Sequence, residues 1–280
     1  MKITNKYNLP EAIYQACCIY NRKPVPDRFS VTELIDSPYI RHLKMIHWEE
    51  IEEDASDRLW ALLGSVIHAI LEKTEIENSL QEEKLKLTID KYTITGKVDL
   101  YHDKTVHDYK ITSYTSYLYG IKQEWINQLN VYAYMYKKYG FKVDKLQIHA
   151  IFRDWNKNKA LRENLPEIPF CTYDIPLWTE EKQLSYIKHR LIAHTYNSHN
   201  SPLHCTPEER WAKPTTYALM DTNRKRAKKI YTDMKETPKI LKSSEYIERR
   251  EGEHIRCKHY CPVRKFCQIK LTDWIKLEEG

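Results

Sequence analysis

The sequence predicts an α/β layered domain followed by a cysteine-rich C-terminal segment. Apolar residues recur at helical spacing in some segments and alternate with polar residues in others, and the two kinds of segment succeed one another between residues 55 and 197. We therefore expect a helix, three strands, a helix, a strand and a helix there, in that order. A change of composition near residue 200 suggests a first domain over residues 1–200 and a second segment over residues 201–280.

The helices are predicted from capping and periodicity. Ser30 stands three residues before Glu33, a spacing typical of a capping box at a helix start. Residues 121–138 have helical spacing, and a last long helix is expected after Thr179. The first helix of the layered domain is indicated by an apolar stripe, which consists of Leu63, Val66, Ile67, Ile70 and Leu71.

The strands are predicted from alternation. Apolar and polar residues alternate from Leu85 to Ile89 and again from Leu146 to Phe152. Between these segments lie two short runs, GKVDLY (96–101) and TVHDYKI (105–111), which we expect to pair as a hairpin. Residues 222–250 are polar, carry the basic run RKRAKK at 224–229, and are expected to form one or more helices.

Composition excludes several classes of protein. The 45 Lys and Arg residues exceed the 39 Asp and Glu residues by six, which allows nucleic-acid binding without requiring it. No apolar run approaches the ~20 residues that cross a bilayer, and the first residues lack the pattern of a secretory signal. We therefore expect a cytoplasmic protein that is not inserted in a membrane. Only 6 glycines argue against a glycine-rich phosphate loop, whereas 21 tyrosines favour binding surfaces.

Two acids and a lysine form the sharpest motif. If the hairpin turns about Asp103 and Lys104, the numbers of paired residues sum to 207, and Asp99 stands opposite Asp108. Lys110 is two residues from Asp108 and therefore points to the same face of the strand. Opposed like charges are unfavourable unless a cation lies between them, and hard oxygen ligands suit Mg²⁺ or Mn²⁺. The alternative is a polar hairpin whose acids are solvated.

Other polar residues lie on helical stripes near this hairpin. His68 follows Gly64 by one turn on the same helix face, which could leave the imidazole open to a metal. Gln128 and Tyr132 share a face of the later helix, where an amide and a phenol could hold a phosphate or a base edge. The alternatives are a histidine with a structural role and ordinary hydrogen bonding on a helix surface.

Taken in order, these motifs resemble the PD-(D/E)XK nuclease superfamily, in its RecB-like exonuclease branch. GSVIHAILE, GKVDL, DYKIT and QLNVYAY fall within residues 64–132 where the motifs of that branch fall, and Asp108 stands where many members have Glu. The resemblance implies a restriction-endonuclease-like α/β/α core with a mixed central sheet. It also implies a C-terminal Cys-rich helical segment, packed on the core and closed by a metal cluster.

The resemblance also implies a mechanism. Asp99 and Asp108, with the Tyr109 carbonyl and His68, would hold one or two Mg²⁺ or Mn²⁺ ions. Lys110 would orient or deprotonate the attacking water, and Gln128 and Tyr132 would position the DNA. The catalytic set is then expected to be His68, Asp99, Asp108 and Lys110.

Seven cysteines without a secretion signal indicate metal ligands more than disulfides. Cys257, Cys261 and Cys267 lie within eleven residues, and Cys205 is the best candidate for a fourth ligand. Four thiolates suit Zn²⁺ or an iron–sulfur cluster. The one-plus-three spacing resembles the 4Fe–4S site of RecB-like nucleases, although Ser37 stands where many of those have their lone cysteine. Zn²⁺ and free thiols remain the alternatives.

The sequence is thus interpreted as a metal-dependent DNA exonuclease that acts at DNA ends in recombination or repair. The segment around Cys205 resembles phage-encoded exonucleases, which implies a phage-type process in a bacterial or phage-infected cell. Expected partners are DNA, a single-strand annealing recombinase and further copies of this chain in a homo-oligomer. The alternatives are a non-catalytic nucleic-acid-binding or assembly module and a zinc-ribbon regulator.

Overall fold

The structure, a computed structural model, describes residues 1–19, 21–196 and 204–268. By internal contacts the chain divides into two compact units, residues 1–203 and 204–280, and each is described by itself. Within the described residues no helix is long and apolar enough to cross a membrane.

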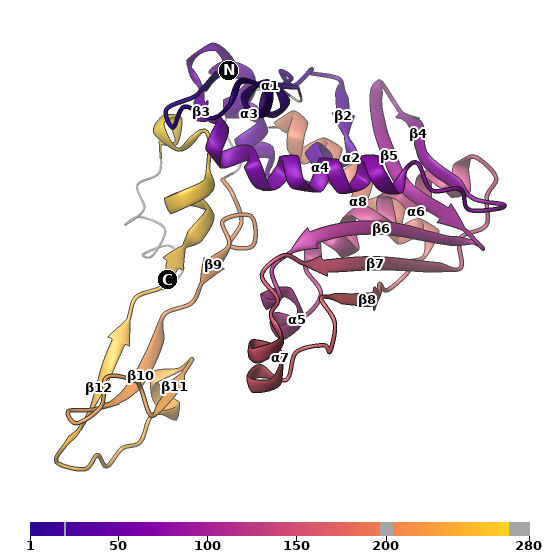
Figure 1. Cartoon of the computed structure of the whole chain (residues 1–280). Helices are drawn as coiled ribbons and strands as arrows, with labels where there is room; N and C mark the ends of the chain where they lie inside the picture. The colour runs from indigo at the N-terminus through magenta and orange to yellow at the C-terminus, as the bar shows by residue number, and fades with distance from the viewer. Residues whose placement is uncertain (20, 197–203, 269–280) are drawn as a thin grey trace. The chain divides into compact units, whose positions relative to one another are not determined.

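A mixed six-stranded sheet forms the centre of the first unit (Figure 1). Its strand order is β2-β5-β6-β7-β8, and β4 also pairs with β5. The pairs β2–β5 and β6–β7 are parallel, and the pairs β4–β5, β5–β6 and β7–β8 are antiparallel. The strands are β2 (Arg28–Ser30), β4 (Leu80–Ile89), β5 (Tyr92–His102), β6 (Thr105–Thr112), β7 (Lys145–Phe152) and β8 (Phe170–Asp174). The predicted layered α/β class and mixed sheet are confirmed.

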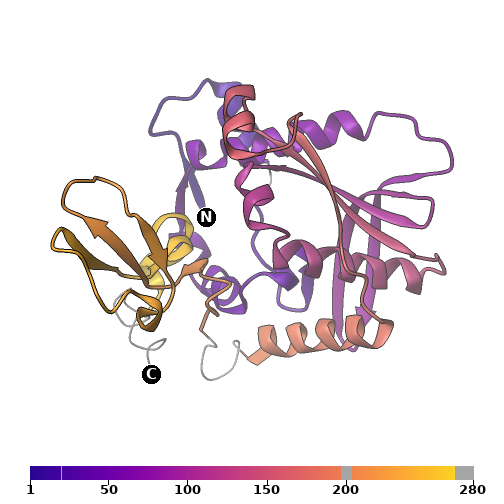
Figure 2. The same ribbon diagram turned by 90° about the horizontal axis from the view of Figure 1, so that it is seen from below.

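Helix α6 (Gln123–Lys138) covers one face of this sheet, and α8 (Glu180–Tyr196) packs against α6 (Figures 1 and 2). Both helices follow the periodicity predicted for them. Ten residues of α6 are buried, because the helix lies between the sheet and α8. The core that results includes Leu129, Tyr136 and Ile148, all fully buried.

A buried amide fixes the position of α6. Asn130 is fully buried, and its side chain donates to the carbonyls of Ile126 and Pro176, each at 2.9 Å. It also accepts from the backbone of Trp178 at 2.8 Å and from Gln183 at 3.3 Å. Such a satisfied network holds the segment before α8 in one register on α6.

Helix α2 (Val31–Ile35) begins at the predicted cap. The Ser30 side chain accepts from the Glu33 amide, and the Glu33 side chain accepts from the Ser30 amide. At the other end of α2, the Arg190 side chain of α8 donates to the carbonyls of Leu34 and Asp36. These contacts join the start of the unit to its last helix.

Among the remaining elements of the first unit, α4 was predicted from its apolar stripe and the others were not. Strands β2 and β8 of the sheet were not predicted either. Most of these unpredicted elements are short, so that few residues carry any periodic signal. The strands are β1 (Lys2–Thr4) and β3 (Glu52–Asp54), and the 3₁₀ turns are η1 (Trp48–Glu50) and η2 (Ala55–Arg58). The helices are α1 (Glu11–Cys18), α3 (Pro38–Ile46), α4 (Leu59–Leu71), α5 (Thr115–Tyr119) and α7 (Lys157–Glu163).

The β5–β6 hairpin has the predicted register. Leu100 pairs with His107 and His102 with Thr105, so that paired numbers sum to 207. Asp103 and Lys104 form the turn with φ values of +45° and +55°. Two positive φ values are those of a type I′ turn, whose twist suits a two-residue hairpin.

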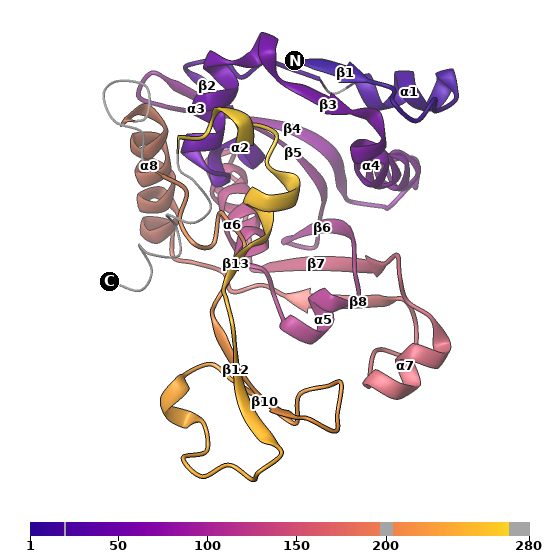
Figure 3. The same ribbon diagram turned by 90° about the vertical axis from the view of Figure 1, so that its left-hand side faces the viewer.

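The second unit corrects one prediction. Residues 222–250 do not form helices: β10 (Thr216–Asp221) pairs antiparallel with β11 (Lys229–Tyr231) and β12 (Glu245–Arg250), as Figure 3 shows for β10 and β12. Within residues 222–250 the strands are short and mostly polar, so they lack the alternation of apolar and polar residues that predicts a strand.

The predicted helical character of the Cys-rich segment is also wrong. Strands β9 (Ala212–Lys213) and β13 (Glu253–His254) pair with each other. Among residues 204–268 the helical elements are three short turns, η3 (Met234–Glu236), η4 (Arg256–Tyr260) and η5 (Arg264–Phe266), of 3₁₀ or π type. Pro262 has no backbone N–H to donate and does not allow a helix to continue through it.

Candidate active site

Three potential metal ligands from three elements meet at the end of α4. His68 Nδ1 lies 3.3 Å from an oxygen of Asp99 on β5 and 3.8 Å from an oxygen of Glu82 on β4. One ligand atom from each residue lies within 4.8 Å of the other two. Within the described residues, this is the one group of three or more histidine, cysteine or acidic side chains that meets so closely.

Glu82 was not predicted as a site residue. Its side chain is 6% exposed and forms an ion pair with Lys97. On either side of Glu82, Gln81 pairs with Leu100 and Glu83 with Val98, so the residue numbers of each pair sum to 181. In the same register, Glu82 stands opposite Asp99. A hairpin register about Asp90 and Lys91 would therefore have placed Glu82 opposite Asp99.

The backbone at Glu82 departs from regular strand geometry. Its φ is +52°, in a region that non-glycine residues rarely adopt. The Glu82–Asp99 pair is missing from the otherwise continuous β4–β5 ladder. Unusual backbone of this kind is concentrated at functional sites, where it turns a side chain in a required direction.

A second group of predicted residues surrounds Asp108 on β6. Lys110 Nζ lies 2.7 Å from Asp108 Oδ2 and donates to Gln128 Oε1 at 3.0 Å. The Gln128 amide donates to Asp108 Oδ1 at 3.2 Å and to the Tyr132 hydroxyl at 3.4 Å. Gln128 and Tyr132 are buried and expose little surface of their own. Gln128 contacts Lys110 and Asp108, and Tyr132 contacts Gln128.

The β6 backbone joins the two groups. The Tyr109 amide donates to Asp99 Oδ2 at 2.7 Å, just beyond the last backbone pair of the β5–β6 ladder. An aspartate side chain thus takes the place that a backbone carbonyl would occupy in a continued ladder. The predicted ligands His68, Asp99 and Asp108 consequently lie around one segment, although the Asp108 carboxylate is outside the 4.8 Å group.

The charges of these residues influence one another. Burial raises the pKa of Asp108 to about 6, and Asp99 acts in the same direction while Lys110 opposes it. A hydrogen bond to Asp99 raises the pKa of His68. Burial would by itself lower the pKa of Lys110, but the carboxylates of Asp108 and Asp99 outweigh it and raise that pKa. Lys110 is therefore an ammonium ion at neutral pH.

The donor set fits a hard divalent cation. The carboxylates of Glu82 and Asp99 and the imidazole of His68 supply mainly oxygen ligands, which Mg²⁺ and Mn²⁺ prefer. Asp108 Oδ2 is buried, and its partner is the Lys110 ammonium group at 2.7 Å. A buried carboxylate oxygen with a lone pair to spare is what a metal site requires.

The predicted cluster cysteines all lie in the second unit. Cys205 is buried, and Cys257, Cys261 and Cys267 are half-buried. Burial raises the pKa of Cys257, and the thiols of Cys261 and Cys267 act in the same direction. Within the described residues no three of these thiols lie within 4.8 Å of one another, so the predicted cluster is not formed there. The basic run near them in sequence forms the β10–β11 turn, where Lys228 pairs with Asp221 and Glu245.

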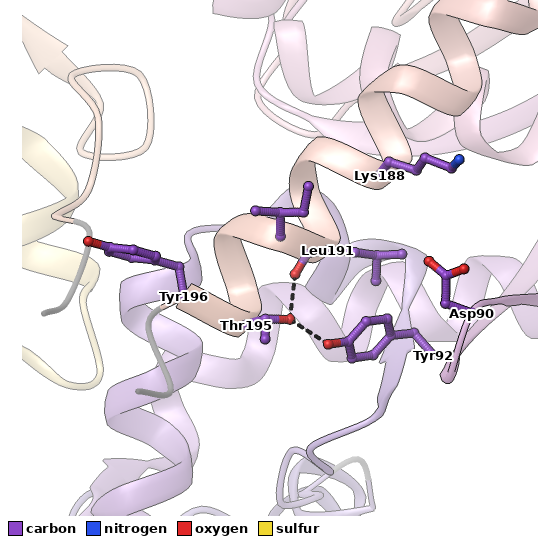
Figure 4. A pocket seen from close by; sticks show the side chains of 7 residues that line it. Asp90, Tyr92, Lys188, Leu191, Thr195 and Tyr196 are labelled. Carbon is purple, nitrogen blue, oxygen red and sulfur yellow. Dashed lines mark hydrogen bonds between the residues drawn. The ribbon is translucent and has the colours of Figure 1, made fainter. Parts of the chain in front are cut away.

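The first unit also has a pocket of about 430 Å³ away from these residues. It is lined by α8 and by the β4–β5 turn, as Figure 4 shows. There the Tyr92 hydroxyl and Thr195 are hydrogen-bonded at 2.8 Å. None of the candidate site residues lines it.

Comparisons with known proteins identify a family and two similar solved structures. The family model described as PD-(D/E)XK nuclease superfamily matches residues 47–268. The chain is similar to a crystal structure described as SSO0001, with 17% identity over 71% of this chain and 87% of that one and a TM-score of 0.46. It is also similar to a phage related exonuclease from Haemophilus somnus 129PT, with 18% identity over 50% and 70% of the two chains and a TM-score of 0.34. A comparison with curated proteins finds no match. Because the family model spans most of the sequence, this chain belongs to the PD-(D/E)XK nuclease superfamily.

Proposed function

We propose that this protein is a divalent-metal-dependent deoxyribonuclease that hydrolyses phosphodiester bonds at DNA ends. The observation that carries the proposal is the meeting of His68, Glu82 and Asp99 next to the buried contact between Asp108 and Lys110. Acidic ligands, an imidazole and a fixed ammonium group around one strand end are the components that metal-assisted phosphodiester hydrolysis needs.

His68, Asp99 and Asp108 would hold Mg²⁺ or Mn²⁺ together with the Tyr109 carbonyl, and we add Glu82 to this set. A bound divalent ion supplies a hydroxide at neutral pH and a positive charge beside the phosphate. The protein's own residues fix the geometry: Asp99 is held by the Tyr109 amide and by His68.

Lys110 would hold the attacking water and the phosphate oxygens by its charge. Its raised pKa favours this role over that of a base, because an ammonium ion has no lone pair with which to accept a proton. Gln128 would act through Lys110, to which it is hydrogen-bonded, and Tyr132 through Gln128. These two are thus positioning residues that place the lysine near the DNA.

For the second unit we propose a metal centre held by Cys205, Cys257, Cys261 and Cys267, either a 4Fe–4S cluster or Zn²⁺. The one-plus-three spacing of the cysteines supports it, although within the described residues no three of these thiols lie within 4.8 Å of one another. Brown colour and visible absorbance in anaerobically purified protein, lost in Cys261→Ser, would support the cluster. Colourless protein with stoichiometric zinc would support Zn²⁺.

The process is proposed from the resemblance of the Cys205 segment to phage-encoded exonucleases. It would be recombination or repair in the cytoplasm of a bacterial or phage-infected cell. The partners would be DNA, a single-strand annealing recombinase and other copies of this chain.

The nuclease proposal is tested with DNA labelled at the 5′ or the 3′ end, single- or double-stranded, incubated with Mg²⁺ or Mn²⁺. Asp99→Ala and Lys110→Ala should abolish cleavage while the proteins remain folded by circular dichroism. Glu83→Gln is the matched control, because Glu83 is an exposed acid beside Glu82 on the same strand. Unchanged cleavage in both alanine variants would refute the proposal, and metal-independent binding without cleavage would favour a non-catalytic module.

A further inference from the structure

The face of the sheet opposite α6 carries a row of aromatic rings. Ile148 and Ala150 of β7 are fully buried on the α6 side, so the intervening His149 points to the other face. Tyr109 is the registered partner of His149 on β6, and Thr172 is its partner on β8. Phe170 lies two residues from Thr172 and shares its face.

The strands that carry these rings, β6, β7 and β8, lie side by side in the sheet (Figure 1). The rings contact one another across these strands. The ring centroids of Tyr109 and His149 are 5.5 Å apart, and those of His149 and Phe170 are 6.0 Å apart with planes inclined by 10°. Tyr109 also meets the ring of His68 edge-on at 6.5 Å. The row formed by Tyr109, His149 and Phe170, here called the aromatic row, therefore begins beside the candidate metal ligands.

Hydrogen bonds fix the middle of the row. His149 Nε2 lies 3.0 Å from His107 Nδ1, and His149 Nδ1 lies 2.9 Å from the Thr172 hydroxyl. Both ring nitrogens are thus engaged, so the imidazole plane is held parallel to Phe170.

The row remains accessible. Phe170 is 39% exposed, and Tyr109 and His149 are half-buried. Flat rings that are fixed in place and partly open to solvent suit the stacking of unpaired bases, because every base has a π-face whatever the sequence. Aromatic rings on an open sheet face stack two or three bases in other nucleic-acid-binding domains.

We propose that the aromatic row binds the bases of a single DNA strand whose phosphates lead into the site formed by His68, Asp99 and Asp108. The proposal rests on the nuclease function proposed above, and it specifies the substrate as a strand with unpaired bases. A duplex is a poor fit because its bases are stacked on each other and are not available to the rings. The direct ring contact between Tyr109 and His68 supports continuity between the row and the site.

The test measures equilibrium binding of single-stranded oligodeoxynucleotides that contain 2-aminopurine to the full chain. Divalent ions are removed by a chelator so that the DNA is not cleaved. The fluorescence of this base is quenched when it stacks. Phe170→Ala and Phe170→Leu should each weaken binding roughly 5- to 100-fold and relieve the quenching, since an aromatic–base contact contributes that much. Phe170→Leu retains an apolar side chain, so that a loss in both variants is due to the ring.

Phe141→Ala is the matched control: Phe141 is 38% exposed, as Phe170 is at 39%, but it contacts Tyr101 and Tyr136 and lies outside the row. Equal binding by the Phe170 and Phe141 variants would overturn the proposal, and so would an equal loss of affinity for a blunt duplex. Cleavage is assayed separately with Mn²⁺. If binding depends on the aromatic row but the wild type does not cleave DNA, the proposed nuclease function alone is refuted. If the Phe170 variants cleave with the wild-type rate and KM, the proposed role of the aromatic row alone is refuted.

Discussion

Replacing Gly96 tests whether the packing of the core beneath the candidate active site fixes the positions of its catalytic side chains. Gly96 lies on β5 under the ring of Tyr132, and a Cβ added there would lie 2.6 Å from Tyr132 Cε1 and 3.1 Å from Val31 Cγ2. Carbon atoms pack at about 3.5–4.0 Å, so the ring would have to move by roughly 1 Å. The Tyr132 hydroxyl is 3.4 Å from Gln128, and Gln128 contacts both Lys110 and Asp108.

We expect Gly96→Ala to lower the free energy of unfolding by about 1–3 kcal/mol, the usual cost of overpacking. Cleavage should fall by roughly 10- to 100-fold, because a displacement of about 1 Å at a catalytic group has an effect of that size. The two quantities are measured by urea unfolding and by initial rates of DNA cleavage at saturating Mn²⁺.

Gly64→Ala is the control. A Cβ at Gly64 has no neighbour within 4 Å, and the residue lies inside α4, so alanine should stabilise the protein by up to ~1 kcal/mol. Wild-type cleavage by Gly96→Ala would refute the idea that Tyr132 and Gln128 position Lys110. Loss of cleavage by a stabilised Gly64→Ala would indicate that substrate uses the open space before His68.

Further predictions concern metal binding and pH. Mn²⁺ at about 100 times its dissociation constant should stabilise the wild type by ~2.7 kcal/mol in thermal unfolding, and Glu82→Gln should reduce this gain while Glu83→Gln should not. An equal gain in both variants would exclude Glu82 as a ligand. His194 is buried, and burial lowers its pKa to about 3, so the unfolded chain gains the proton first and stability falls as the pH drops below about 6.5. The loss should reach ~2 kcal/mol at pH 5 relative to pH 7, and urea unfolding of His194→Gln should show less of it. An identical pH dependence in the variant would assign the effect to other groups.

The sequence predicted those parts of the site that depend on local regularities. Asp108 and Lys110 follow from strand alternation, Gln128 and Tyr132 from helix spacing, and the β5–β6 register from a two-residue turn. These regularities act over a few residues, so they can be read without knowing the rest of the fold.

Glu82 was missed because its place depends on a second hairpin and on an unusual backbone angle. Its φ of +52° interrupts the alternation, and the residue looks like one of several acids at the start of β4. The second unit was misread for a related reason. Strand β10 finds its partners at residues 229–231 and 245–250, and pairing over such separations leaves no local pattern in polar strands.

The turn between β5 and β6 can be changed to test whether the site depends on the register of this hairpin. Asp103 and Lys104 both have positive φ, which is unfavourable for side chains other than Asn and Gly. Asp103→Asn combined with Lys104→Gly should therefore raise the free energy of unfolding by about 1–2 kcal/mol. Lys104→Val, which places a β-branched residue at the same angle, should lower it.

The cleavage rate of the turn variants shows whether the turn affects only the stability of the protein or also the register that places the site residues. In the stabilised variant the pairing that sums to 207 is retained, so Asp99 still reaches the Tyr109 amide and cleavage should remain at the wild-type rate. A slip of one residue would instead turn Asp108 and Lys110 to the opposite face of the sheet. A stabilised variant with greatly reduced cleavage would mean that the strained turn serves the site directly, and that register alone does not explain how this hairpin places its two acids.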